Sequence, residues 1–99
     1  MIVPAVLGAS EVNDSTANLS WIGSVNSKIT YLNVSTSQSL KPDGTLETTD
    51  IVNGVVTGQN SYSKSSLSPG TYYWNIVIDG CGQRKISELG TFTIKPSTD

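Results

Sequence analysis

Short apolar runs separated by turn residues follow one another along this chain, and several alternate apolar with polar positions. The clearest run is residues 71–78, in which every second position is apolar: Tyr72, Trp74, Ile76 and Ile78. A period of two in aromatic and β-branched residues predicts a β-strand. Because one face of this strand is strongly apolar, a second layer must cover it. The pattern therefore favours two β-sheets packed face to face.

The same pattern predicts strands on both sides of this run, and no stretch shows a capped helical period. We expect strands at residues 5–12, 17–22, 28–35, 61–67, 71–78 and 86–94, with shorter ones at 46–48 and 51–56. The shorter strands surround Asn53-Gly54, a dipeptide that favours hairpin turns. Residues 41–45 contain Pro and Gly and are typical of a turn. Gly90 indicates a bulge within the last strand.

Inward-facing positions along these strands predict the core. In the strand at 28–35, Leu32 and Val34 face inward, with Thr30 as a partial third member, and Tyr31 and Asn33 face outward. A register slipped by one residue would bury Tyr31 instead. The predicted core consists of Leu19, Trp21, Leu32, Val34, Leu67, Tyr72, Trp74, Ile76, Phe92 and Ile94. It contains one indole from each layer.

The composition suits an all-β extracellular module. The 99 residues are the length of one domain, and charged residues make up only 14% of them. Ser and Thr supply much of the remaining polarity, and they suit turns and exposed strand positions. The net charge is −2, and the six Lys and Arg residues are scattered. Because phosphate backbones need a basic stripe, we expect neither nucleic acid nor an anionic membrane as a partner.

Two further features bear on where the protein works. Cys81 is the single cysteine, so it is either an unpaired loop thiol or a site for an intermolecular bridge or other thiol reactivity. Residues 2–7 are apolar, but they are short and follow no basic segment. We therefore expect a first strand there, and neither a signal peptide nor a transmembrane helix.

Three blocks resemble the fibronectin type III family, in its bacterial or archaeal branch. They read ANLSW at residues 17–21, LSPGTYYW at 67–74 and SELGTFTI at 87–94. The resemblance implies a seven-stranded, antiparallel, immunoglobulin-like β-sandwich over residues 1–95, with 96–99 as a tail or the start of a linker. It also implies a tyrosine corner, in which the Tyr72 hydroxyl bonds back to the backbone near Leu67. The integrin-binding Arg-Gly-Asp of some members is absent, and residues 79–85 read DGCGQRK.

Residues suited to catalysis or metal binding are few. The chain has no His and no Gly-X-Ser-X-Gly elbow, so a serine nucleophile would lack its usual base. Glu47 and Asp50 are close in sequence, but no neighbouring residue would separate their pKa values. Asp43, Glu47 and Asp50 do not follow a calcium-loop spacing and are typical of a polar turn. We expect no enzyme activity, no cofactor and no metal.

Three Asn residues fit the N-glycosylation acceptor pattern: Asn13, Asn18 and Asn33. In a chain rich in Ser and Thr, such matches arise by chance.

Binding surfaces are the remaining possibility. Loops at the ends of a sandwich are held rigidly by the sheets, and the loops at residues 23–27 and 79–85 should cluster at one end. Gln83 and Arg84 are the candidate contacts there. Tyr31 and Tyr73 are expected as an exposed aromatic pair, which either stacks on a sugar or a protein or shields the sheet as a cross-strand pair.

An odd number of antiparallel strands places the two chain ends at opposite ends of the domain, so that copies can be strung together. We therefore expect a non-catalytic spacer or adhesion module of a larger secreted or cell-surface protein, monomeric in isolation, with flanking domains as partners. The alternative is an accessory module attached to a secreted enzyme, with a carbohydrate or a protein as ligand.

Overall fold

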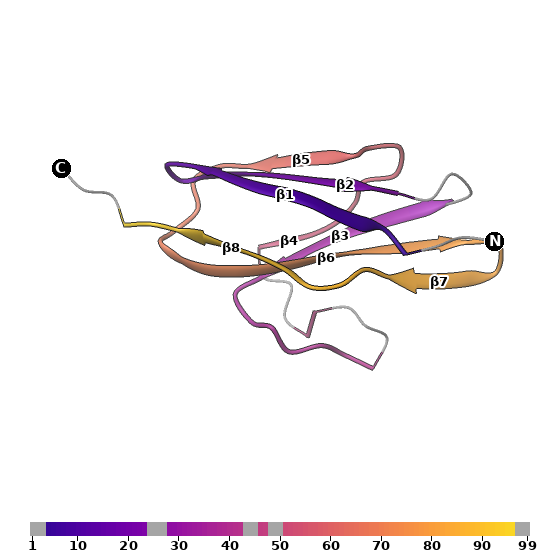
Figure 1. Cartoon of the computed structure of the whole chain (residues 1–99). Coiled ribbons are helices and arrows are strands. Elements are labelled where there is room, and N and C mark those ends of the chain that lie inside the picture. Colours follow the sequence, from indigo (N-terminus) through magenta and orange to yellow (C-terminus); the bar gives the residue numbers. More distant parts are fainter. Residues whose placement is uncertain (1–3, 24–27, 43–45, 48–50, 97–99) are drawn as a thin grey trace.

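Two antiparallel sheets lie face to face in the computed structural model, which describes residues 4–23, 28–42, 46–47 and 51–96 (Figure 1). The first sheet has the order β1-β2-β5, formed by Val6–Asn13, Thr16–Ile22 and Ser61–Lys64. The second has the order β4-β3-β6-β7, with β8 also paired to β6; these strands are Val52–Val55, Ile29–Ser35, Gly70–Gly80, Gln83–Ile86 and Gly90–Ile94. The predicted β-sandwich is confirmed. The described residues include no helix long and apolar enough to cross a membrane.

The last predicted strand, residues 86–94, is divided in two. Val77 of β6 lies opposite Ile86 of β7, whereas Trp74 lies opposite Gly90 of β8, so the outer strand has one residue more than β6 between these pairs. Ser87 sits at the break, where its hydroxyl accepts a hydrogen bond from the Ile76 amide at 2.8 Å. The Ser87 hydroxyl takes the place of a backbone carbonyl as the acceptor for this amide, so the β-ladder is interrupted here. The described residues therefore form eight strands where seven were predicted.

The hairpin predicted at Asn53-Gly54 is wrong. Both residues lie inside β4, opposite Asn33 and Leu32 of β3. Val52 and Val56 on either side are both buried in the core, which requires an extended backbone between them. Of the strand predicted at 46–48, Leu46 forms only an isolated bridge with Leu40. Residue 48 and most of the turn predicted at 41–45 lie outside the described residues.

All ten predicted core residues are buried, with exposures between 0% and 7%. Trp21 of β2 and Trp74 of β6 meet across the two sheets, with ring centroids 6.4 Å apart and planes tilted by 60°. The Trp74 indole nitrogen donates a hydrogen bond to Ser10 Oγ at 3.1 Å. The Trp21 indole nitrogen is buried, and it has no hydrogen-bond partner among the residues that the structure describes. The pair joins the two layers, as predicted.

The tyrosine corner is also confirmed. The Tyr72 hydroxyl donates a hydrogen bond to the Ser68 carbonyl oxygen at 2.5 Å. The Tyr72 ring stacks on Phe92 of β8, with centroids 5.1 Å apart. The hydrogen bond and the stacking together hold the turn before β6 against the second sheet.

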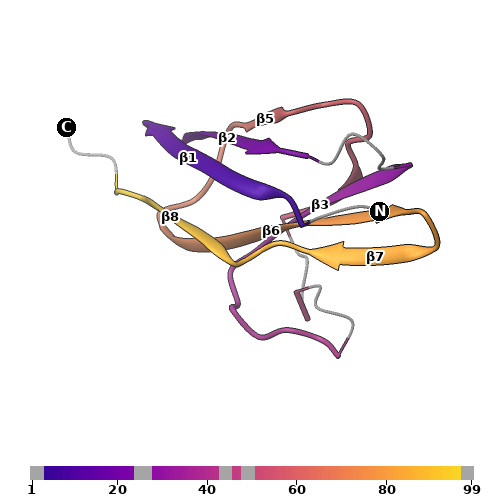
Figure 2. The same cartoon turned by 45° about the vertical axis from the view of Figure 1, so that its right-hand side comes forward.

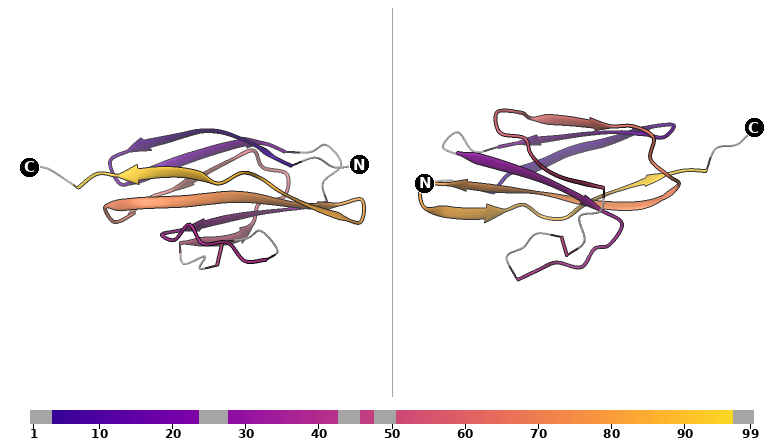
Figure 3. Two further views of the ribbon diagram at one scale, coloured as in Figure 1. Left: turned by 60° about the horizontal axis from the view of Figure 1, so that its bottom comes forward. Right: turned by 180° about the vertical axis from the view of Figure 1, so that it is seen from behind.

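The outer face of the second sheet is partly covered. Asn33, Ser35, Asn75 and Val77 point away from the core, yet all four are buried. Figures 1 and 3 show the described parts of residues 36–47 running beneath this face, and Leu46 there is fully buried. The Asn33 amide donates to the Asn75 side-chain oxygen at 3.2 Å, which satisfies polar atoms that water cannot reach.

The strands run lengthwise between two distinct ends of the sandwich. β1 begins on the side of the sandwich that carries the β6–β7 turn, whereas β8 leaves at the far side (Figures 1 and 2). We call the end with the β6–β7 turn the N-terminal end and the other the C-terminal end.

Candidate functional site

Tyr31, Asp79 and Arg84 form a cluster on the outer face of the second sheet, near the N-terminal end. Asp79 of β6 lies opposite Arg84 of β7. Tyr31 is two residues along β3 from Ile29, which lies opposite Asp79 on the other side. Side chains two residues apart on a strand share a face, so the register brings the three together. We call this group the Tyr31–Asp79–Arg84 cluster.

The guanidinium of Arg84 is held in one orientation. Its Nε donates to Asp79 Oδ1 at 2.7 Å, and its Nη2 donates to Asp79 Oδ2 at 2.9 Å. The Arg84 Cζ atom also lies 5.7 Å from the centroid of the Tyr31 ring. A bidentate ion pair with a cation over an aromatic face restricts a side chain that is otherwise flexible. The Arg84 side chain remains 42% exposed and that of Asp79 27% exposed.

These contacts lower the pKa of Asp79 below its ordinary value. The hydrogen bond from Arg84 is the largest cause, and the positive charge of Arg84 and a hydrogen bond from Tyr31 act in the same direction. Partial burial raises the pKa but is outweighed. The carboxylate is therefore ionised at neutral pH and serves as the anchor of the cluster.

Apolar residues surround the cluster. Val55 of β4 lies opposite Tyr31 and is 63% exposed, and Ile29 is 38% exposed. Ile86 of β7 is half-buried. An oriented Arg and a Tyr among exposed apolar side chains make up the kind of surface that is enriched at protein interfaces.

The predicted site residues are only partly brought together. Tyr31 and Arg84 are in contact, and Gln83 is exposed beside Arg84 on β7. Tyr73 lies opposite Ser35, four residues along β3 from Tyr31, a separation of about 13 Å along the strand. The predicted Tyr31–Tyr73 pair is therefore wrong. The register that separates the two rings is the one that pairs Leu32 with Ile76 inside the core.

The loop predicted at residues 79–85 is a tight turn. β6 continues to Gly80 and β7 begins at Gln83, which leaves only Cys81 and Gly82 between the strands. Both have positive φ, 52° and 69°, as a type I′ hairpin turn requires. Cys81 is exposed and free. Gln83 and Arg84 are therefore strand residues. Most of the loop predicted at 23–27 lies outside the described residues.

The three glycosylation patterns differ in accessibility. Asn33 is only 3% exposed and is hydrogen-bonded to Asn75, so the folded domain does not present it. Asn13 and Asn18 are exposed, and Asn18 accepts a hydrogen bond from Ser63 at 2.8 Å.

Asp79 is the member of the cluster that the sequence analysis missed. The available signal was a pair of opposite charges, Asp79 and Arg84, on either side of a Gly-rich turn. Within the described residues, no group of three His, Cys, Asp or Glu side chains lies close enough together to hold a metal ion. Glu47 is exposed, and Asp43 and Asp50 lie outside the described residues.

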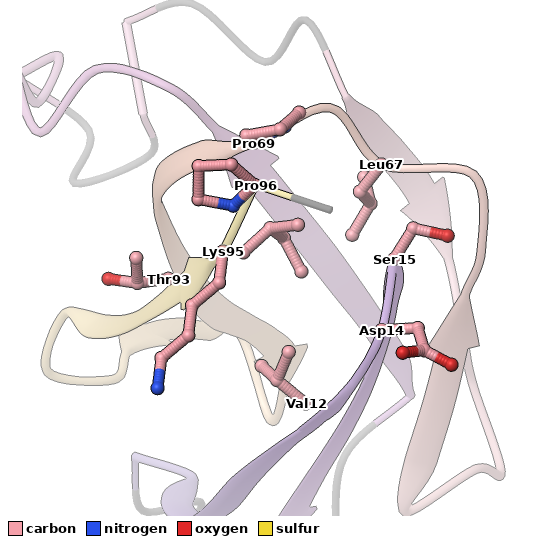
Figure 4. Close-up of a pocket in the computed structure, with 9 residues that line it drawn as sticks. Val12, Asp14, Ser15, Leu67, Pro69, Thr93, Lys95 and Pro96 are labelled. Atoms are coloured by element: carbon pink, nitrogen blue, oxygen red, sulfur yellow. The ribbon is translucent and has the colours of Figure 1, made fainter. Parts of the chain in front are cut away.

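A hollow of about 570 Å³ lies at the C-terminal end (Figure 4). The β1–β2 turn, the segment before β6 and the end of β8 form its walls. Its lining residues are Val12, Asp14, Ser15, Leu67, Pro69, Thr93, Ile94, Lys95 and Pro96. We call it the C-terminal pocket.

The arrangement of strands defines the class of protein as an immunoglobulin-like β-sandwich. No family model matches the chain, and no curated protein matches it in sequence. Among solved structures, the fibronectin type III domain of human collagen XX is 20% identical with a TM-score of 0.67, over 94% of this chain and 91% of that one. A Fn3-like protein from Clostridium thermocellum is 14% identical with a TM-score of 0.59, over 99% and 94%. The chain has the fibronectin type III fold, as the resemblance implied.

A similar structure also occurs within an enzyme. The β-1,2-glucanase from Parabacteroides distasonis is 14% identical with a TM-score of 0.66, over 99% of this chain. The chain spans only 13% of the length of that glucanase. The similarity at this level concerns the fold alone.

Proposed function

We propose that this domain is a non-catalytic spacer or adhesion module of a larger secreted or cell-surface protein. The observation that carries the proposal is that β1 begins at one end of a two-layer sandwich and β8 leaves at the other (Figure 1). Neighbours attached before β1 and after β8 are then held apart by the length of the strands. The glucanase, in which a domain of this fold is a small part of a longer chain, supports such a modular role.

Rigidity is what such a role needs, and two features supply it. The Trp21–Trp74 contact ties the layers together. The first strand, β1, pairs antiparallel with β2, with a shift of register between Leu7 and Ser10, and the last strand, β8, pairs antiparallel with β6. A force applied at the two chain ends would therefore load these ladders in shear, so that several hydrogen bonds share it.

The experiment places a donor and an acceptor fluorescent protein at the two ends of the chain and measures energy transfer in single molecules. The domain should give one narrow distribution of transfer efficiency. A Gly/Ser linker of the same length is the control and should give a broad one, because such linkers are random coils. A distribution for the folded domain as broad as that of the linker would contradict the proposal.

A second candidate function is an accessory ligand-binding module of a secreted enzyme, with the Tyr31–Asp79–Arg84 cluster as its site. The oriented guanidinium and the exposed apolar neighbours favour it. A sugar could not stack freely on the ring face of Tyr31 that Arg84 covers, so a glycan would contact the exposed guanidinium of Arg84 first.

Titration of ¹⁵N-labelled protein with β-1,2-linked gluco-oligosaccharides separates the two functions. A spacer shows no chemical-shift changes. A glycan-binding module shows changes centred on Tyr31, Gln83 and Arg84, and these disappear in Arg84→Ala. Lys64→Ala, on β5 of the other sheet, is the matched control and should leave any binding intact.

A further inference from the structure

A segment between β3 and β4 covers part of the outer face of the second sheet. We call its described residues, 36–42 and 46–47, the strap, and Figures 1 and 3 show them beneath this sheet. Leu46 of the strap is fully buried, and so is Val77 of the outer face. Among the described residues, the hydrophobic core cluster between the sheets includes neither Leu46 nor Val77. The strap is therefore packed on the sandwich as a separate layer.

The surface under the strap is mostly polar. Asn33, Ser35 and Asn75 are buried there, although they point away from the core. Amide and hydroxyl groups are well solvated by water, so uncovering them costs far less free energy than uncovering a face of apolar side chains. Of the apolar residues in the described strap, Leu46 is fully buried, whereas Leu40 is 51% exposed. One apolar side chain, that of Leu46, thus anchors the strap to the sheet.

Contacts within the strap give it a shape of its own. The Glu47 amide donates to the Ser39 carbonyl oxygen at 2.8 Å, and Leu40 and Leu46 form an antiparallel bridge. The Ser39 amide donates to Ser37 Oγ at 3.3 Å. These bonds join strap residues to each other, so they stay in place when the strap moves as one piece.

Both ends of the strap are fastened to the same end of β3. The Ser37 amide donates to Ser35 Oγ at 3.0 Å. Ile51, the next described residue beyond the strap, donates its amide to the Val34 carbonyl oxygen at 3.2 Å. Val34 and Ser35 are neighbours in β3. Because the two attachments lie side by side, the strap can pivot about them without separating any pair of strands.

We propose that the strap moves away from the second sheet as a unit while the two sheets stay packed, and that this opening uncovers Asn33, Ser35 and Asn75. The two amides lie between Tyr31 and Tyr73 on the same face, since Asn33 is two residues from Tyr31 on β3 and Asn75 is two residues from Tyr73 on β6. A layer held by few apolar contacts opens at a lower free energy than the whole domain unfolds. The strap thus controls access to the middle of this face.

Thiol labelling of buried cysteines tests the proposal. In a Cys81→Ser background, Ser35→Cys places a thiol under the strap and Ala17→Cys places one in the core, both at positions that are 0% exposed. The urea denaturation curve of each variant gives the labelling rate that global unfolding alone allows. Ser35→Cys should react at least about 10-fold faster than that rate and with little dependence on urea, because opening exposes little surface. Ala17→Cys is the control and should react at that rate. A Ser35→Cys thiol that reacts only at its global unfolding rate would overturn the inference.

Leu46→Asp tests the anchor independently. A charged side chain is not tolerated at a buried apolar position, so the strap should stay open in this variant. The Trp74 signals should keep their dispersion in NMR spectra, whereas the side-chain amide signals of Asn33 and Asn75 should shift. Leu40→Asp, at the exposed partner of the Leu46 bridge, is the control and should leave these amides unchanged. Collapse of the Trp74 signals, or unshifted amides in Leu46→Asp, would contradict a strap that opens by itself. The spacer proposal would survive that result, because the energy-transfer experiment measures only the separation of the chain ends.

Discussion

The indole of Trp74 occupies the space that any side chain at Gly90 would need. A Cβ atom built on Gly90 would lie 2.5 Å from Nε1 and 2.8 Å from Cε2 of Trp74. The two residues face each other across β6 and β8. The same nitrogen donates to Ser10 of β1, so Trp74 cannot move aside without losing a hydrogen bond between the sheets. Glycine at position 90 is thus required by the packing of the core.

Gly90→Ala should lower the free energy of unfolding by about 1–3 kcal/mol, the usual cost of forcing an extra group into a packed core. Urea denaturation measures it. Gly54→Ala is the control, since a Cβ there meets nothing within 4 Å, and it should change stability by no more than about 0.5 kcal/mol. Equal effects of the two substitutions would show that the contact between Gly90 and Trp74 does not constrain the fold.

Trp21→Ala should cost about 3–5 kcal/mol, the range for truncating a large core aromatic. Trp21 is 3% exposed and contacts Trp74 across the sandwich, so the substitution leaves a cavity between the sheets. Ile22→Ala, at the neighbouring position that is 68% exposed, should have little effect. Calorimetry or denaturant titration that gave a loss below about 1 kcal/mol for Trp21→Ala would contradict the buried position of its indole.

The core was predictable because its signals are local. Alternation along β2 and β6 identifies Trp21 and Trp74 without knowledge of which strands pair, and the Pro69-Gly70 turn places Tyr72 at the start of its strand. Asn33 was not predictable in this way. Its burial depends on residues 36–42 and 46–47 packing beneath the second sheet, a long-range contact with no periodic signal. The break at Ser87 was not predictable either, because it depends on a single side-chain hydroxyl that accepts a hydrogen bond from the Ile76 amide. The alternation of apolar and polar residues contains no sign of such a bond.

The candidate site was only half predictable. Arg84 and Tyr31 could be singled out by residue type, but their contact requires the register of three strands. That register also separates Tyr31 from Tyr73. The sequence predicts a loop of seven residues at 79–85 because Gly residues on both sides of Cys81 suit a loop as well as a tight turn. Only the positive φ angles of Cys81 and Gly82 distinguish the two-residue type I′ hairpin turn.

Tyr72→Phe tests the tyrosine corner. It removes the hydrogen bond to the Ser68 carbonyl but keeps the ring stacked on Phe92, so the loss should be about 0.5–1.5 kcal/mol, the net value of one hydrogen bond. Tyr62→Phe, on the half-buried ring of β5, should be close to neutral. Hydrogen exchange of the Thr71 and Tyr72 amides should accelerate in Tyr72→Phe alone if the corner holds this turn.

The Asp79–Arg84 ion pair should make stability depend on pH in the acid range. The pKa of Asp79 is lower in the folded domain than in the unfolded chain, chiefly through the hydrogen bond from Arg84. The contribution is therefore fully present above the unfolded value of about 3.9, and it is lost as pH falls through the lower, folded pKa. Because both side chains are partly exposed, it should amount to about 0.2–1 kcal/mol.

The measurement is the free energy of unfolding against pH for the unsubstituted chain and for Asp79→Asn and Arg84→Met. Either substitution should reduce the loss of stability in acid, and the double substitution should reduce it no further, because both remove one interaction. Arg84→Met keeps the apolar stem over Tyr31 while removing the charge, and direct titration of the Asp79 carboxyl by NMR should then show its pKa rising. An unchanged pKa in Arg84→Met would show that the guanidinium does not hold this carboxylate in solution.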